Sequence, residues 1–340
     1  MKKVVCFGEI MLRLSPMGYT RFVQADSFGV VYGGGEANVS VSLANYGVPA
    51  AFVSKVPANE IGQSAINSLR RFGVDTSGVA VGGERLGIYY LEKGASQRPS
   101  KVVYDRKYSS ISAAEAADFD WETLFADADW FHFTGITPAL SDSLAAITLE
   151  ACKLAKQKGM TVSCDLNFRK NLWSSEKAGQ VMGGLMPYVD VVIANEEDAD
   201  KVFGIKASNT DVTGGKLNHD GYKDVAKQLC DRFGCRYAAI TLRTSISASD
   251  NRWAAMLYDG TNYCFSKEYP VHIVDRVGGG DSFGGGLIYA LKAGMDSQAA
   301  IEFATAASCL KHTIEGDTNH VTVAEVLALA GGDGSGRVQR

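Results

Sequence analysis

The sequence has little that would point to disulfides, a bound metal or nucleic acid. Its seven cysteines are odd in number and scattered over 340 residues, with no Cys-x-x-Cys pair. Reduced thiols are therefore expected, rather than a disulfide framework or a zinc site. The five histidines show no metal-ligand spacing. Lysine and arginine number 34 against 38 aspartate and glutamate, a net charge of −4, which lacks the basic excess of a general nucleic-acid binder.

Long hydrophobic runs are also missing. No stretch approaches the roughly 20 apolar residues of a transmembrane helix. The apolar run at residues 4–7 is too short for the core of a signal peptide. We therefore expect a cytoplasmic protein with no membrane partner.

Several common catalytic motifs are absent. The sequence has no Gly-x-x-x-x-Gly-Lys-Ser/Thr, which excludes a P-loop enzyme, and neither His-Glu-x-x-His nor a Gly-x-Ser-x-Gly elbow. No Gly-x-Gly-x-x-Gly follows the first predicted strand, which disfavours a nicotinamide oxidoreductase.

What is present is an alternation of apolar strand-like runs with stretches of helical periodicity. Helices of 10–15 residues between strands predict βαβ units and a mostly parallel sheet. The predicted strands are residues 4–7, 51–55, 130–133, 161–164, 189–193 and 238–242, with a hairpin at 253–258 and 262–265. The predicted helices are residues 36–46, 61–72, 141–157, 175–186, 196–203, 222–233, 281–293, 297–312 and 322–329.

Two separate stretches, about 10–32 and 86–108, alternate apolar and polar residues instead. This pattern predicts short antiparallel strands. A small β appendage on an α/β body is a natural lid over the edge where such sheets bind ligands. We therefore predict one α/β domain over residues 1–330 that includes this lid, followed by a flexible tail at 331–340.

The strongest local feature is the glycine-rich stretch 275–286. Gly278, Gly279 and Gly280 lead into a predicted helix with Asp281 in its first turn. Glycines let a backbone approach a phosphate closely, and the helix N-terminus adds partial positive charge. A carboxylate beside such an anion site can accept a proton from an attacking hydroxyl. A plain glycine turn with Asp281 as a helix cap is the alternative.

A second glycine loop, residues 33–38, opens the helix predicted at 36–46. It could form a floor for a small polar ligand, with Asn38 bonding a hydroxyl. It could equally be a hinge between lid and body.

Together these two loops resemble the two signatures of the ribokinase-like (PfkB) family of carbohydrate kinases. The segments are Gly-Gly-x-x-x-Asn near the N-terminus and Asp-x-x-Gly-x-Gly-Asp in the last third. The resemblance implies a three-layer fold with a central mostly parallel sheet and a β lid. It also implies ATP with Mg²⁺, Asp281 as general base, and an anion hole at Gly278, Gly279 and Gly280.

One departure from the family pattern and two arginines limit the range of possible substrates. Ribose and fructose kinases of this family usually carry an aspartate soon after the first strand, and residues 8–13 contain none. The guanidinium group of arginine can donate two parallel hydrogen bonds to one carboxylate, so two arginines in one pocket would suit a sugar acid. The sequence is similar to the family's 2-keto-3-deoxygluconate kinases, which implies phosphorylation of the 6-hydroxyl of that sugar acid. The substrate contacts then implied are Gly34, Asn38, Tyr89, Tyr104, Arg106, Arg169 and Asp281. For Arg106 and Arg169 surface charge is the alternative, and for the two tyrosines lid packing.

The segments expected to contact the nucleotide and the metal depart further from the family's usual pattern. The family's Asn-x-x-Glu reads here as Asn195 followed by Asp198, a shorter carboxylate that could reach Mg²⁺ through water. The loop after the strand at 238–242 is serine-rich where glycine is common. We predict nucleotide contacts at Asn195, Thr241, Arg243, Gly278 and Gly280. Arg276 stands where threonine is frequent in the family.

Other interpretations remain open. The chain could phosphorylate another sugar, such as fructose or a nucleoside, or be a sugar-acid binding protein without turnover. Apolar residues in the lid stretch, such as Phe22, Phe28 and Val31, predict that two lids pair in a homodimer.

Overall fold

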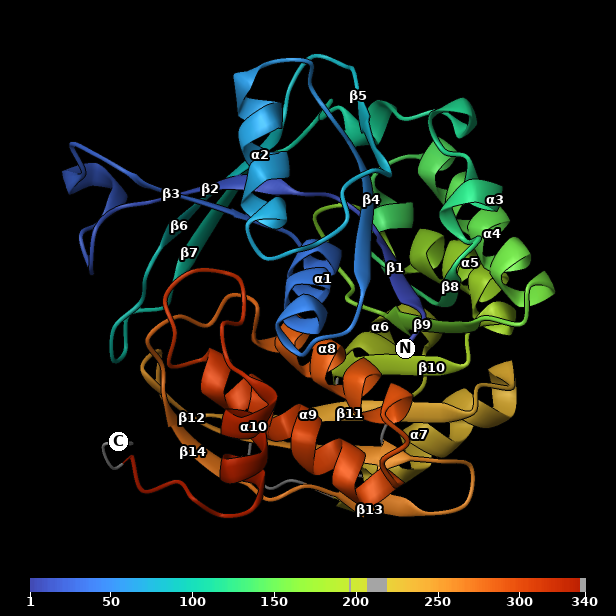
Figure 1. The fold of residues 1–340 in the computed structure, drawn as a ribbon. Helices are drawn as coiled ribbons and strands as arrows, with labels where there is room; N and C mark the ends of the chain where they lie inside the picture. The colour runs from blue at the N-terminus through green and yellow to red at the C-terminus, as the bar shows by residue number, and fades with distance from the viewer. Residues whose placement is uncertain (196, 207–218, 337–340) are drawn as a thin grey trace.

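A computed structural model describes residues 1–195, 197–206 and 219–336 of the chain. Its main strands are β1 (Lys3–Phe7), β4 (Ala50–Val56), β5 (Val79–Val81), β8 (Ala128–Thr134), β9 (Thr161–Asp165), β10 (Val191–Asn195), β11 (Tyr237–Ser245), β12 (Asp250–Tyr258), β13 (Tyr263–Phe265) and β14 (Tyr269–His272). Within the described residues they form one mostly parallel sheet in the order β13-β12-β11-β10-β9-β8-β1-β4-β5, with β14 paired to β12 (Figure 1). This is the α/β architecture that the alternating pattern predicts.

Helices cover both faces of this sheet. They are α1 (Gly35–Asn45), α2 (Glu60–Arg70), α3 (Trp121–Leu124), α4 (Asp142–Gln157), α5 (Ser175–Leu185), α6 (Asp198–Phe203), α7 (His219–Phe233), α8 (Gly279–Lys292), α9 (Ser297–Lys311) and α10 (Val323–Ala330). The sheet separates two hydrophobic cores, and β1 contributes alternate residues to each. Val5 and Phe7 pack in one core with α4, α5 and α7. Val4 and Cys6 pack in the other core, with α1, α8 and α9. Burial on both faces explains why the strand is a continuous apolar run.

A second, four-stranded sheet stands apart from the body, at the left of the view in Figure 1. It consists of β2 (Met11–Ser15), β3 (Gly29–Gly33), β6 (Gly87–Glu92) and β7 (Lys101–Asp105), in the order β3-β2-β6-β7. Strand β2 pairs antiparallel with β3 but parallel with β6. The alternation at 10–32 and 86–108 therefore predicts the strands correctly, while their mixed pairing is a finding of the structure.

A buried ion network ties this small sheet to the body. Arg13 on β2 is almost fully buried, and its Nη2 and Nη1 lie 2.6 Å from carboxylate oxygens of Asp275 and Asp317 respectively. The Tyr89 hydroxyl on β6 donates to Asp317. Losing one member would leave a buried charge unpaired, which typically costs about 3–5 kcal/mol. The network therefore holds the small sheet beside the glycine-rich motif that contains Asp275.

The remaining differences from the sequence analysis are local. Strands β5 and β14 and the short helix α3 were not predicted, since each is short. Position 196, where the predicted helix 196–203 begins, and residues 337–340 of the predicted tail lie outside the described residues. All seven cysteines are free thiols, as expected. No helix in the described part of the chain is long and apolar enough to cross a membrane.

Candidate active site

The predicted site residues meet at one cavity of about 460 Å³ between the small sheet and the carboxyl ends of the central strands. Strand β9 brings Asp165 to this edge and β10 brings Asn195. Every residue that we predicted for the site except Gly279 lines the cavity: Gly34, Asn38, Tyr89, Tyr104, Arg106, Arg169, Asn195, Asp198, Thr241, Arg243, Gly278, Gly280 and Asp281. A Cβ on Gly279 would lie 2.5 Å from the His312 ring, so this glycine serves close packing behind the cavity.

At the N-terminus of α8, the Gly279 N–H donates to the Arg276 carbonyl at 3.4 Å, while the N–H groups of Gly280 and Asp281 have no acceptor among the described residues. Its N-cap, Gly278, has a left-handed backbone with φ of 80°, and no side chain caps the helix. A Cβ on Gly278 would lie 1.8 Å from the Asp317 carbonyl oxygen, so only glycine fits there. The first N–H groups of a helix have no intrahelical acceptor. Gly280 has open space around its Cα, so an anion can approach these donors.

Asp281 is the third residue of α8 and makes no capping bond, so the helix-cap interpretation is wrong. Its Oδ2 instead accepts a hydrogen bond of 2.7 Å from the Asn38 amide on α1. Burial raises the pKa of Asp281 to about 6, and the Asn38 bond acts in the opposite direction. The two glycine loops are thus joined through Asn38 and Asp281. A carboxylate with this pKa is largely ionised at neutral pH and can accept a proton.

Two further carboxyl groups face the cavity beside Asp281. Burial, and then the charges of Asp198 and Asp281, raise the pKa of Asp165 well above its ordinary value. Burial also raises the pKa of Asp198, whose oxygens accept bonds from the Phe168 and Asn195 backbone N–H groups. The exposed Arg169 lowers the pKa of all three carboxyls. This end of the cavity therefore favours a cation or a cationic side chain.

Arg106 lies on the opposite wall and is held by a residue that the sequence analysis did not select. Glu9 is almost fully buried, and one of its oxygens accepts from the Arg106 Nε at 2.9 Å and also from its Nη2. Its other oxygen accepts from Ser109 Oγ at 2.7 Å. The Arg106 guanidinium lies 5.5 Å from the centre of the Tyr104 ring. Glu9 thus fixes one edge of the guanidinium and leaves its remaining N–H groups for a ligand.

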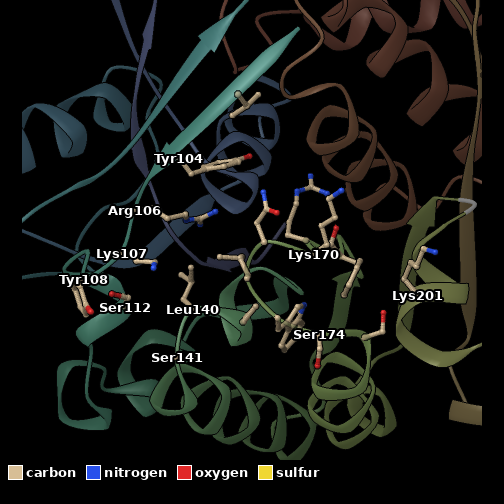
Figure 2. Close-up of a pocket in the computed structure, with 18 of the residues that line it drawn as sticks. Tyr104, Arg106, Lys107, Tyr108, Ser112, Leu140, Ser141, Lys170, Ser174 and Lys201 are labelled. Carbon is tan, nitrogen blue, oxygen red and sulfur yellow. The ribbon is translucent and has the colours of Figure 1, made fainter. Parts of the chain in front are cut away.

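A second cavity, of about 1170 Å³, continues from the first along the small sheet. It shares Tyr104, Arg106 and Arg169 with the first cavity. Figure 2 shows Tyr104, Arg106 and Lys107 on the side of the small sheet, with Leu140, Ser141 and Ser174 opposite. Lys107, Lys170 and Lys201 add positive charge to its walls. The approach to Arg106 and Arg169 is therefore wide and basic, as an anionic ligand requires.

Tyr89, by contrast, has its hydroxyl engaged with Asp317. Its ring lies 6.0 Å from that of Tyr104. Tyr104 is 43% exposed and is the freer of the two tyrosines for a ligand. The Asn38 side-chain amide likewise donates a hydrogen bond to Asp281.

Sequence reasoning missed Glu9, Arg13, Asp165, Asn251 and Asp317. One signal was available for Arg13, because a charged residue between apolar residues of a strand can be buried with a charged partner; Glu9 lies between two predicted strands and offers no such signal. Asp165 directly follows the strand predicted at 161–164, and the carboxyl ends of strands are where α/β sheets place ligand contacts. Asn251 ends the serine-rich loop that follows the strand predicted at 238–242, while Asp317 lies in a segment with no distinguishing pattern.

Comparisons with known proteins show which proteins the chain resembles in sequence and fold. The model of the pfkB family of carbohydrate kinases matches residues 1–323. A 2-dehydro-3-deoxygalactonokinase of Haloferax volcanii is 34% identical over 97% of this chain and 98% of its own length. A 2-dehydro-3-deoxygluconokinase of Thermoproteus tenax is 27% identical over 93% and 90%. The crystal structure of a 2-dehydro-3-deoxygluconokinase from Thermotoga maritima is 53% identical, covers 97% of this chain and 98% of its own, and superposes with a TM-score of 0.94.

Proposed function

We propose that this chain, which belongs to the pfkB family of carbohydrate kinases, transfers the γ-phosphoryl group of ATP to the 6-hydroxyl of 2-keto-3-deoxygluconate. This compound is also called 2-dehydro-3-deoxygluconate, and two relatives of the chain are named as kinases of it. One observation carries the proposal: Asp281 and the open N-terminus of α8 share a cavity with Arg106 and Arg169. A proton acceptor and an anion hole thus share one cavity with two arginines, whose guanidinium groups are suited to bind a carboxylate.

The chemistry assigns one task to each part of the site. The sugar hydroxyl oxygen attacks the γ-phosphorus, the bond from that phosphorus to the β–γ bridging oxygen breaks, and ADP leaves. Asp281 accepts the hydroxyl proton. The free N–H groups around Gly278 and Gly280 stabilise the charge on the transferring group. The small sheet covers the cavity and limits water, which would otherwise compete with the sugar for the phosphoryl group.

The residues present suit Mg²⁺ held mainly by the nucleotide. The charges of Asp198 and Asp281 raise the pKa of Asp165, so a nearby cation would favour the ionised form of this carboxyl. The described residues contain no group of three acidic, histidine or cysteine side chains close enough to ligate a metal directly. Mg²⁺ usually keeps several waters and binds one or two carboxylates plus substrate phosphates. Asp198 would reach it through water, and the ion would neutralise phosphate charge.

The function is tested by measuring ADP release with Mg-ATP over a panel of acceptors. The panel contains 2-keto-3-deoxygluconate, its galactonate epimer, fructose and a nucleoside, and the position of the new phosphate is assigned by NMR. We expect turnover with the sugar acids and phosphate at carbon 6. Absence of turnover with every acceptor would favour the binding-protein alternative, and turnover with neutral acceptors alone would remove the sugar acid from the proposal.

The pH dependence follows from Asp281. Since the pKa of this carboxyl is raised to about 6 and only its ionised form accepts a proton, kcat/KM should rise with pH through about 6 and level off above it. The Asn38 bond lowers that pKa, so Asn38→Ala should move the rise to higher pH. The pH profiles of kcat/KM for both proteins check this. Identical profiles would contradict the assignment of Asp281 as base.

The outer face of the small sheet supports a homodimer. Arg13, Val31, Tyr89 and Tyr104 occupy opposed positions and share the inner face, as their register shows. Most of the alternate positions are apolar and partly or fully exposed: Leu12, Leu14, Val30, Tyr32, Ile88, Tyr90 and Val103. Asp105, opposite Ile88, and Glu92, opposite Lys101, are the charged residues on this face. Apolar faces of this kind mark protein interfaces. Two copies should pair through these strands, and a monomeric mass from sedimentation equilibrium would contradict this.

A further inference from the structure

Lys311 is a fully buried lysine behind the N-terminus of α8. It is the last residue of α9, and it is 0% exposed. Its ammonium donates to the Ile314 carbonyl at 3.1 Å and to the Asp275 carbonyl at 3.5 Å, and it forms no ion pair within the described residues. A buried charge without compensation is strongly unfavourable, so this position requires compensating charges nearby.

The two carboxylates of the buried ion network, Asp275 and Asp317, supply this compensation. Burial lowers the pKa of Lys311, while the charges of Asp275 and Asp317 act in the opposite direction. Both carboxylates also pair with Arg13. Two cations thus face two carboxylates, and the cluster is neutral as a whole. The other titratable groups around it are uncharged at neutral pH: Tyr89, whose pKa burial raises, and His312 and His320, whose pKa values burial lowers.

This cluster packs against the glycine segment that leads into α8. A Cβ on Gly278 would lie 1.8 Å from the Asp317 carbonyl oxygen and 3.4 Å from Lys311 Cε. The Asp275 N–H donates to the His312 carbonyl at 3.2 Å. Lys311 therefore joins the segment before α8 to the turn after α9, directly behind the proposed anion hole.

The same cluster acts on Asp281. Burial is the main cause of the raised pKa of this carboxyl; among the nearby charges, Asp317 raises the pKa further, whereas Arg169 and Lys311 lower it. The carboxyl of Asp165 also acts together with Asp281, from β9. Arg169 is exposed in the cavity, while Lys311 lines neither cavity. Of these two cations, Lys311 therefore keeps its effect on Asp281 whether or not a ligand is bound.

We propose that Lys311 is a positioning residue for phosphoryl transfer: its ammonium neutralises the carboxylates behind the anion hole and keeps Asp281 in the form that accepts a proton. This inference rests on the proposed function, which assigns Asp281 as the base. Lys311 itself contacts neither sugar nor nucleotide. An uncharged side chain at this position would leave a net negative charge behind the anion hole, which would disfavour both the ionised Asp281 and an approaching phosphate.

The test follows the titration of Asp281 directly, by NMR of the ligand-free protein with ¹³C-labelled aspartate carboxyls. The Asp281→Asn variant identifies the resonance. Lys311→Met keeps the length of the side chain but loses its charge, so Asp281 should titrate about one pH unit higher than in the wild type. Asp317→Asn removes the opposing charge and should move the titration to lower pH. The double variant Lys311→Met/Asp317→Asn should titrate close to the wild type.

The pH dependence of turnover provides the second measurement. The ratio of kcat/KM at pH 8 to kcat/KM at pH 6 should be about fivefold larger in Lys311→Met than in the wild type, because less of Asp281 is ionised at the lower pH. The double variant should regain a ratio near that of the wild type. Within each protein this ratio is independent of the fraction of active enzyme, so a merely structural role would not change it.

Lys292→Met is the matched control. Lys292 is the last residue of α8, its side chain is 5% exposed, and it pairs with Asp129 outside both cavities. This variant loses a buried ammonium from the other end of the same helix. Both its Asp281 titration and its kcat/KM ratio should equal those of the wild type.

An Asp281 titration that is the same in the wild type, Lys311→Met and Asp317→Asn would overturn the proposal. A lower Tm in Lys311→Met with an unmoved titration would mean that Lys311 only supports the fold. Should Lys311→Met fail to fold, Asp317→Asn decides, because an unmoved titration there removes the coupling of the cluster to Asp281. Absence of sugar phosphorylation by the wild type, with the titration still moved by both substitutions, would sink the proposed function and leave the coupling standing.

Discussion

Replacing Asp281 with asparagine is expected to lower kcat by about 10²- to 10⁴-fold, the usual contribution of a positioned general base. Asparagine has nearly the same shape, and its side chain can still bond Asn38, which lies 2.7 Å from Asp281. It cannot accept the hydroxyl proton. The α8 backbone is unchanged, so the anion hole persists and ADP affinity should stay close to that of the wild type. Steady-state kinetics with 2-keto-3-deoxygluconate, together with ADP calorimetry, measure both quantities.

Asp296→Asn provides the control for this experiment. Asp296 caps the neighbouring helix α9, its Oδ1 accepts from the Ala299 N–H at 2.8 Å, and it lies outside the cavity lining. Asparagine caps helices about as well as aspartate, so kcat should be unaffected. If Asp281→Asn also kept kcat within about threefold of the wild type, Asp281 would not be the base, and the anion hole alone would carry the catalysis.

Local sequence signals predict the fold and one half of the site. Periodicity places β1, β8, β9 and β10 because each is buried on both faces and so reads as an apolar run. The stretch 275–286 predicts a glycine loop that leads into a helix, and the structure has that loop with Gly278 left-handed. These features depend on neighbours in the chain, which is why a single sequence reveals them.

The parts that escaped prediction are long-range pairs. Arg13 meets Asp317 across 304 positions, and Arg106 meets Glu9 across 97. No local pattern tells which buried charges will pair, because the topology of two sheets brings them together. The same limit applies to the hydrogen-bond partner of Asp281. Its place in the first turn of a helix left a cap as the alternative, whereas the residue that it bonds, Asn38, lies on a helix 243 positions earlier.

If Arg106 and Arg169 bind the substrate carboxylate as proposed, replacing them should remove the preference for a sugar acid over a neutral sugar. We expect Arg169→Gln to lower kcat/KM for 2-keto-3-deoxygluconate by about 10²-fold, and Arg106→Gln by at least as much, because each loses a charge-assisted contact to the carboxylate. The comparison substrate is 3-deoxyfructose, in which a hydroxymethyl group replaces the carboxylate. Its kcat/KM should change little in either variant, so the ratio for the two substrates measures recognition of the acid.

Arg106 needs a second variant because it also neutralises Glu9, which is 2% exposed. Arg106→Gln alone leaves that carboxylate buried without its cation and should lower Tm. The double variant Glu9→Gln/Arg106→Gln should recover stability yet still fail to prefer the acid. Arg98→Gln is the control. Arg98 lies in the loop that joins β6 to β7 and pairs with Glu92 at 3.0 Å outside both cavities, so this variant should keep the wild-type ratio. A double variant with wild-type preference for the acid would mean that Arg106 supports the small sheet and does not bind the substrate.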